Sequence, residues 1–241
     1  MNHSSQRNVF PWVTILAGIV GFGLRYWLFS ATDTRGLLPE YHISSVLCFI
    51  LLALALGVCF MKLQNIALTD TYGSLFPASP VAAAGILLGG VGLGLSAFTP
   101  ETAGLFRFLL PIFGVLTAAT MTIAAYCRLK GTRPNCLLHC VVVVYLVLRI
   151  MVSCRGWGSE PQVQLYFFQL LACLFLLMAC YYRAELDVHA KGHRQYVFFA
   201  QAALFCCCLC LQGVDMLFYL SAAIWMAADF CVLHPAGKYA A

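Results

Sequence analysis

Two arginines, Arg25 and Arg149, lie within apolar stretches of the sequence, where a buried charge is costly and points to a function or to a partner. Arg155 follows the second of them, and Trp27 and Trp157 lie close by. A guanidinium group offers a planar fork of donors to a carboxylate or a phosphate, and it stacks on aromatic rings. The pattern predicts a pocket that binds or transports a small anionic or zwitterionic solute.

The same arginines also have a structural interpretation. A long cationic side chain can reach the membrane surface along its apolar stem, and a buried one pairs with an acid. Five acids are predicted on the side of the membrane that holds five arginines, so internal pairing is the stronger interpretation. The acids are Asp33, Glu40, Glu101, Glu160 and Asp215, and the arginines are Arg25, Arg35, Arg107, Arg149 and Arg155.

A second polar group gathers near the opposite side. Cys136, His139 and Cys140 share one helix face because of their i, i+3, i+4 spacing, and thiolate and imidazole together suit a soft metal or haem iron. No CxxC or HExxH spacing accompanies them, so we expect no metal and no cofactor. For Asp229, an acid inside an apolar segment, we expect a hydrogen bond to His139. The alternative is a proton or cation path, which intramembrane carboxylates often mark.

Motifs of soluble and intramembrane enzymes are missing. Ser96 lies in the sequence GLSA, which only approximates the intramembrane serine protease pattern because that pattern has Gly after the Ser. There is no Walker loop and no dinucleotide fingerprint. The sequence leaves enzymatic activity open and favours a protein without one.

The elements that position these residues follow from composition. Of 241 residues, 62% are hydrophobic and only 10% are charged, whereas a soluble domain carries about 25% charged residues. This excludes a soluble enzyme, a nucleic-acid-binding domain and a disordered chain, and makes membrane lipid the expected partner. Most of the thirteen cysteines fall in apolar runs, where a thiol acts as a small hydrophobe.

A membrane-spanning helix needs about 20 apolar residues, and continuous apolar runs form helices because lipid offers no hydrogen bonds to the backbone. We therefore predict an all-α, polytopic transmembrane bundle that forms one domain over residues 1–241. Its eight spans are 10–30, 43–61, 80–98, 105–127, 135–153, 163–182, 196–212 and 215–233. The last two remain open to an alternative, one span with a re-entrant segment.

The positive-inside rule sets the orientation. Nine of the fourteen Lys and Arg residues fall on one side when the N-terminus is inside: Arg7, Lys62, Arg128, Lys130, Arg133, Arg183, Lys191, Arg194 and Lys238. We predict N-in and C-in topology in the cell membrane, with the arginine–aromatic pocket on the outer face. Similar segments end the first and fifth spans, LRYWLFS at 24–30 and LRIMVS at 148–153, which suggests two parallel four-span repeats.

Two short windows, DTRGLLPEYH at 33–42 and RGWGSEP at 155–161, resemble segments of uncharacterised multi-span membrane proteins of Gram-positive anaerobes. The resemblance implies a membrane protein and carries no activity with it.

Two further functions stay open. Glycine pairs with small-xxx-small spacing lie in 80–98, and such pairs permit close approach of two helices. They suggest a non-catalytic subunit or sensor that docks on a membrane protein partner or on a second copy of the chain. Cys136, His139 and Cys140, which we call the Cys136 group, support the alternative that the chain is a metal or redox membrane protein.

Overall fold

The computed structural model describes residues 9–31, 42–64, 76–99, 104–157, 164–189, 192–212 and 215–231. All regular structure in this part of the chain is helical, and each helix coincides with one predicted segment. The eight helices are α1 (Val9–Ser30), α2 (Ile43–Gln64), α4 (Pro80–Ser96), α5 (Phe106–Lys130), α6 (Cys136–Trp157), α7 (Gln164–His189), α8 (His193–Leu209) and α9 (Met216–Cys231). The predicted all-helical class is confirmed, and the segments 196–212 and 215–233 correspond to separate helices.

The helices have the character of an integral membrane protein. Five of them, α1, α2, α5, α6 and α7, contain stretches long and apolar enough to cross a membrane, while α4 and α9 are apolar but shorter. Large apolar side chains such as Leu16, Leu54 and Phe108 are more than 60% exposed on the outer surface, as expected for a surface that faces lipid. The number of crossings and the orientation stay predictions.

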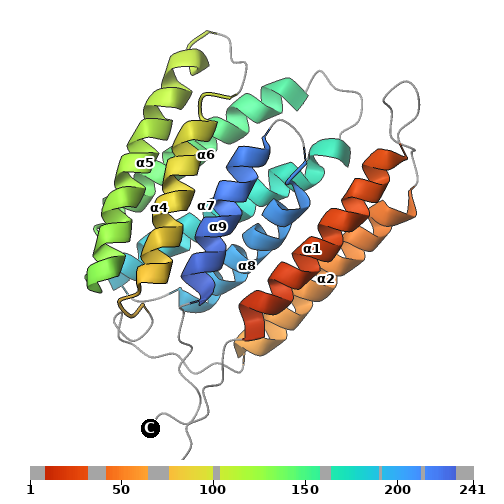
Figure 1. Ribbon diagram of the computed structural model, residues 1–241, viewed down its shortest axis with the longest axis horizontal. Coiled ribbons are helices and arrows are strands. Elements are labelled where there is room, and N and C mark those ends of the chain that lie inside the picture. The colour runs from red at the N-terminus through yellow and green to blue at the C-terminus, as the bar shows by residue number, and fades with distance from the viewer. Residues whose placement is uncertain are drawn as a thin grey trace, which may run out of the picture.

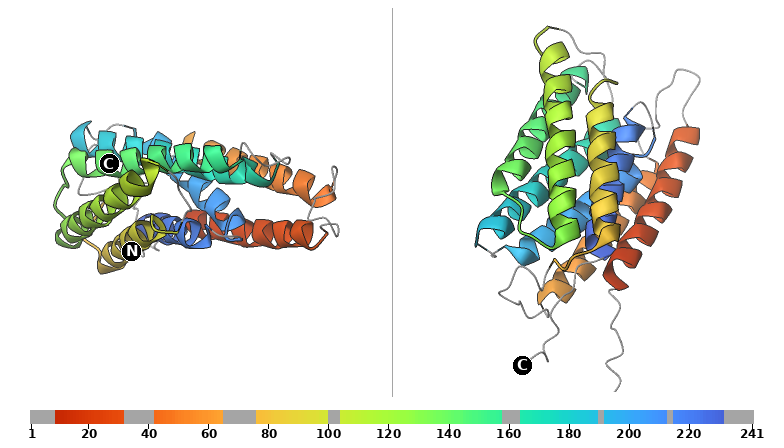
Figure 2. Two further views of the ribbon diagram at one scale, coloured as in Figure 1. Left: turned by 90° about the horizontal axis from the view of Figure 1, so that it is seen from above. Right: turned by 60° about the vertical axis from the view of Figure 1, so that its left-hand side comes forward.

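Six helices form a closed ring in the order α4, α5, α6, α7, α8, α9, with α9 packed back on α4. The α1–α2 pair lies outside this ring, against α8, and forms one edge of the molecule (Figures 1 and 2). Helix α8 is therefore almost completely buried. The pair that would correspond to α1–α2 in a repeat is α6–α7, which belongs to the ring, so helix contacts differ between the two halves and the parallel repeat is not confirmed.

Successive helices alternate in direction (Figure 1), which gives the bundle two ends. The Asp229 end is where α1, α4, α6 and α8 begin and where α2, α5, α7 and α9 finish. At the opposite end, which we call the Asp215 end, α9 begins and α8 finishes. Each end holds a set of buried polar side chains.

The glycines of α4 are used inside the bundle. A Cβ atom added at Gly85 would lie 2.0 Å from the Cβ of Ala228 on α9, and one added at Gly90 would lie 2.4 Å from the Cβ of Met121 on α5. Further glycines repeat this pattern, with Gly89 and Gly92 against α9 and Gly94 against α5. The glycine face thus packs α4 between two helices of its own chain, and it no longer motivates docking on a partner.

Candidate functional site

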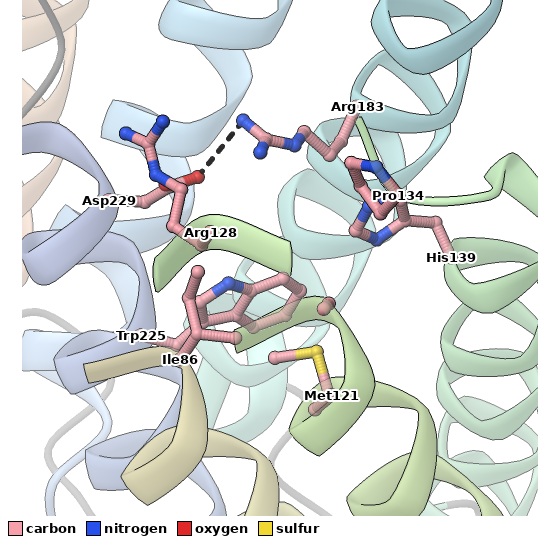
Figure 3. A pocket seen from close by; sticks show the side chains of 9 residues that line it. Ile86, Met121, Arg128, Pro134, His139, Arg183, Trp225 and Asp229 are labelled. Atoms are coloured by element: carbon pink, nitrogen blue, oxygen red, sulfur yellow. Dashed lines mark hydrogen bonds and ion pairs between the residues drawn. The ribbon is translucent and has the colours of Figure 1, made fainter. Parts of the chain in front are cut away.

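The carboxylate of Asp229 is the centre of a buried polar group at the Asp229 end. Arg183 donates from Nη1 to Asp229 Oδ2 at 3.3 Å, and Arg128 Nε lies 3.7 Å from Oδ1. The hydroxyl of Tyr196 also donates to Oδ2. Three helices, α5, α7 and α8, therefore hold one carboxylate of α9. Figure 3 shows the two arginines beside this carboxylate.

A second carboxylate adjoins the first. Asp187 lies one turn after Arg183 on α7, and its Oδ1 lies 4.0 Å from Arg183 Nε. Its other oxygen, Oδ2, lies 2.9 Å from Nε2 of His139 on α6. Arg183 thus bridges two buried acids. We call Arg128, His139, Arg183, Asp187, Tyr196 and Asp229 the Asp229 cluster.

The charges of this cluster balance. With a neutral imidazole, two guanidinium groups offset two carboxylates, and all four charged side chains are at most 5% exposed. Balance is needed because an unpaired charge taken out of water costs several kcal/mol, at least about 3.

An aromatic ring lies between the two arginines. The guanidinium carbon of Arg183 is 3.6 Å from the ring centre of Phe76, and that of Arg128 is 4.8 Å from the same centre. Cations on the faces of aromatic rings are attracted by the ring quadrupole. Phe76 therefore adds to the stabilisation of both cations that the carboxylates provide.

Local sequence explains why these side chains meet. Helix α5 ends at Gly131, which adopts a left-handed conformation with φ of 68°, a common helix stop because glycine has no Cβ. The preceding turn carries Arg128, whose carbonyl accepts from the backbone N–H of Ser79. Ser79 in turn caps α4, accepting from Ala82 N–H. The end of α5 and the start of α4 are thus fixed together.

A pocket opens beside the cluster. It is lined by residues of α4, α5, α6, α7 and α9 and of the α5–α6 connection: Ile86, Met121, Ala124, Arg128, Pro134, His139, Arg183, Trp225 and Asp229. Charged groups form one side, and Trp225, Ile86 and Met121 form the other (Figure 3). The space holds about one water molecule. We call it the Asp229 pocket.

The predicted hydrogen bond between His139 and Asp229 is wrong in its partner. The carboxylate within reach of His139 is that of Asp187, because Arg128, Arg183 and Tyr196 occupy Asp229. The expected pairing of Asp229 with other helices is nevertheless present.

The Cys136 group does not converge. Cys140 is exposed, Cys136 is partly exposed with its thiol 3.7 Å from Asn135 Oδ1, and His139 is buried. Within the described ranges no three His, Cys, Asp or Glu side chains are placed to hold a metal ion. The metal or redox alternative therefore has no ligand set in these ranges.

At the Asp215 end, Arg149 follows the structural interpretation. It forms an ion pair with Asp215 through Nη2, and Nη1 donates to the carbonyl of Ser96 at 3.2 Å. Its guanidinium lies 5.1 Å from the ring centre of Phe218. The arginine of α6 thereby ties the last turn of α4 to the start of α9.

Arg25 has different neighbours. It is buried, it donates to the thiol of Cys210 at 3.4 Å, and it lies over the rings of Phe29 and Phe168. Since Cys210 ends α8 and Asp215 precedes α9, Arg25 and Arg149 hold the two sides of the α8–α9 connection.

The remaining residues of the predicted outer site do not join them. Arg155 is exposed and lies over Phe106. Trp27 is half exposed and contacts His42 edge to face. The side chain of Trp157 lies outside the described part of the chain, as do Asp33, Glu40, Glu101 and Glu160. The Asp229 pocket includes none of the predicted outer residues.

Sequence reasoning missed Arg128, Arg183, Asp187 and Tyr196 as site residues. The predicted segments stop at 127 and 182, each one residue before an arginine that the structure places inside a helix. The hydropathy pattern therefore assigns Arg128 and Arg183 to the connections between helices. The available signal was the i, i+4 spacing of Arg183 and Asp187, which brings the two side chains to one helix face.

No family model, no curated protein and no solved structure matches the chain. The windows 33–42 and 155–161 lie mostly outside the described residues. Function therefore rests on the site.

Proposed function

We propose that this chain is an eight-span membrane protein that binds a small anionic or zwitterionic solute in the Asp229 pocket, as a step in carrying it across the cell membrane. One observation supports the proposal above all others. Two arginines, an aspartate and a histidine line a pocket at the Asp229 end of a largely apolar helix bundle. Charged residues that face the interior of a membrane bundle commonly mark the path of a solute or an ion.

The chemistry of the lining matches the solute class predicted from the sequence. Arg128 and Arg183 offer forked donors to a carboxylate or a phosphate, and such charge-assisted hydrogen bonds are stronger than neutral ones. Asp229 accepts from an ammonium group, which suits a zwitterion. Trp225 and Met121 offer an apolar wall to the rest of the molecule.

The site differs from the outer arginine–aromatic pocket that the sequence favours. Arg149 is engaged by Asp215 and by a helix carbonyl, whereas Arg128 and Arg183 share Asp229 at 3.7 and 3.3 Å beside a pocket. With the N-terminus inside, the Asp229 end faces the cytoplasm. Since the pocket holds about one water molecule, the proposal requires the helices to move apart before a solute carboxylate can replace Asp229 at one arginine.

Binding of defined probes to the purified protein in lipid nanodiscs tests the proposal. Acetate, glycine and inorganic phosphate are titrated by calorimetry, with acetamide as an uncharged molecule of the shape of acetate. We expect saturable binding of at least one charged probe and none of acetamide. Uptake of the bound probe into proteoliposomes then tests transport.

Substitutions assign the site. We expect Arg128→Gln and Arg183→Gln each to weaken binding by at least about tenfold, the equivalent of losing roughly 1.4 kcal/mol of a charge-assisted contact. Arg155→Gln is the matched control, because Arg155 is exposed and remote from the pocket. If a glutamine variant does not fold, Arg128→Lys keeps the charge and removes the fork. No binding of any probe, or binding that survives both glutamine substitutions, contradicts the proposal.

A further inference from the structure

We infer that an anion enters the Asp229 pocket together with one proton, and that His139 takes up this proton. The inference rests on the proposed function and adds the coupling ion to it. It also separates two solute classes, because a net anion needs the proton and a zwitterion does not.

Charge balance is the first support. The Asp229 cluster is neutral when His139 is neutral, since Arg128 and Arg183 offset Asp187 and Asp229. A bound monoanion would leave one uncompensated negative charge in a buried site, which is strongly unfavourable where water does not reach. Uptake of one proton restores neutrality. A zwitterion such as glycine leaves the balance unchanged.

The geometry around His139 is the second support. Its Nε2 lies 2.9 Å from Asp187 Oδ2, and the two side chains are 5% and 0% exposed. An imidazolium beside this carboxylate is stabilised by its negative charge. Neither ring nitrogen makes a hydrogen bond of good geometry among the described residues. The carboxylate beside the ring lies at Nε2 rather than at Nδ1, and His139 lines the pocket. A doubly protonated ring therefore has one N–H next to Asp187 and a second available to the bound anion.

The other ionisable groups of the site compete less well for the proton. Asp229 is held by two arginines and by the Tyr196 hydroxyl, each of which stabilises the ionised carboxylate. Histidine is also the side chain whose ordinary titration falls in the physiological range. Ionisable groups from every neighbouring helix face His139. They are Arg128 of α5, Arg183 and Asp187 of α7, and Asp229 of α9, to which Tyr196 of α8 is hydrogen-bonded. Cys136 lies one turn before His139 on α6.

Calorimetry in two buffers of different ionisation enthalpy counts the protons taken up per probe bound. For the wild-type protein in nanodiscs we expect one proton with acetate and none with glycine. One coupled proton also makes the affinity for acetate fall about tenfold per pH unit, over the pH range in which the proton must be taken from solution. His139→Gln removes the proton uptake and flattens this pH dependence. Cys140→Ser, at the neighbouring exposed position, leaves both unchanged.

Each outcome decides the inference. Acetate binding without proton uptake overturns it and leaves the proposed function standing. Proton uptake that persists in His139→Gln and disappears in Asp229→Asn overturns the assignment to His139. No binding of acetate, glycine or inorganic phosphate by the folded wild-type protein overturns both the proposed function and the inference. The wild-type proton count decides the coupling even if His139→Gln does not fold.

Discussion

Exchange of two side chains between α4 and α9 tests how the ring is closed. Gly85 and Ala228 face each other where these helices touch, and a Cβ added at Gly85 would lie 2.0 Å from the Cβ of Ala228. The proposed set of proteins is Gly85→Ala, Ala228→Gly and the double exchange Gly85→Ala/Ala228→Gly. The exchange keeps the composition and moves one methyl group across the interface.

The structure gives the size of the effect. Ordinary contact begins at 3.4 Å, so the added methyl group of Gly85→Ala is 1.4 Å too close (3.4 minus 2.0). Helix α4 cannot retreat, because on its other side Gly90 and Gly94 already lie close to Met121 and Ala118 of α5. Overpacking of this kind costs about 1–3 kcal/mol.

The double exchange relieves the clash. Without the Ala228 methyl group, the nearest atoms to the new Cβ are Ala228 Cα and Ile224 O, both at 3.5 Å. Ala228→Gly alone costs about 1 kcal/mol, because glycine is a poor helix former, and the exchange returns that alanine to α4. We therefore expect near wild-type stability for the double variant and a coupling energy of about 2 kcal/mol, within the usual range for residues in contact.

The measurement is the free energy of unfolding in mixed micelles, by denaturing-detergent titration of each protein. Gly23→Ala and Gly57→Ala are the matched controls, since a Cβ at either position meets nothing within 4 Å. We expect these controls to be neutral or slightly stabilising. The packing argument is refuted if Gly85→Ala is as harmless as the controls, or if the double variant is no more stable than Gly85→Ala.

Three further predictions address the ion pair, the topology and a helix stop. Arg149→Met leaves Asp215, whose side chain is 24% exposed, without its cation and should cost about 2 kcal/mol of unfolding free energy. Adding Asp215→Asn should recover part of the loss, and equal stability of both variants would contradict the pairing. Cys140 and Cys154 are exposed and lie near opposite ends of α6. In intact cells, on a background without the other reactive thiols, a membrane-impermeant maleimide should label Cys154 and not Cys140, and the reverse result would invert the predicted orientation. Gly131→Ala forces an alanine into a left-handed conformation with φ of 68° and should cost about 1 kcal/mol, whereas Gly131→Asn should cost less, and equal melting temperatures would refute the strain.

Most of the fold could be predicted from the sequence because lipid imposes a simple rule. Continuous apolar runs must form helices, and all eight predicted segments coincide with helices in the described residues. The ring could not be predicted, because which helices become neighbours depends on side-chain contacts such as that of Gly85 with Ala228. Hydropathy reports that a helix is apolar and does not identify its neighbours.

The site was harder to predict for a related reason. Hydropathy ends a segment where charges begin, so Arg128 and Arg183 were excluded from the helices that carry them. In the structure α5 continues to Lys130 and α7 to His189, so both arginines turn inward and meet Asp229. A charge at the end of an apolar run can thus belong to the core. Only its partners on other helices distinguish it from a loop charge.

The two buried arginine sites differ in the lengths of their ion pairs and in their access to a pocket, and this difference bears on the proposed function. Arg149 has a carboxylate in direct contact and a carbonyl at 3.2 Å in the last turn of α4, where helix carbonyls lack intrahelical partners. A solute that replaced either contact would remove a link between α6 and α4 or between α6 and α9. Arg183 donates to Asp229 at 3.3 Å, whereas the Arg128–Asp229 and Arg183–Asp187 pairs are longer, at 3.7 and 4.0 Å. Both arginines also line a pocket. Under the proposed function, an entering carboxylate replaces Asp229 at one arginine while the other arginine still holds α9.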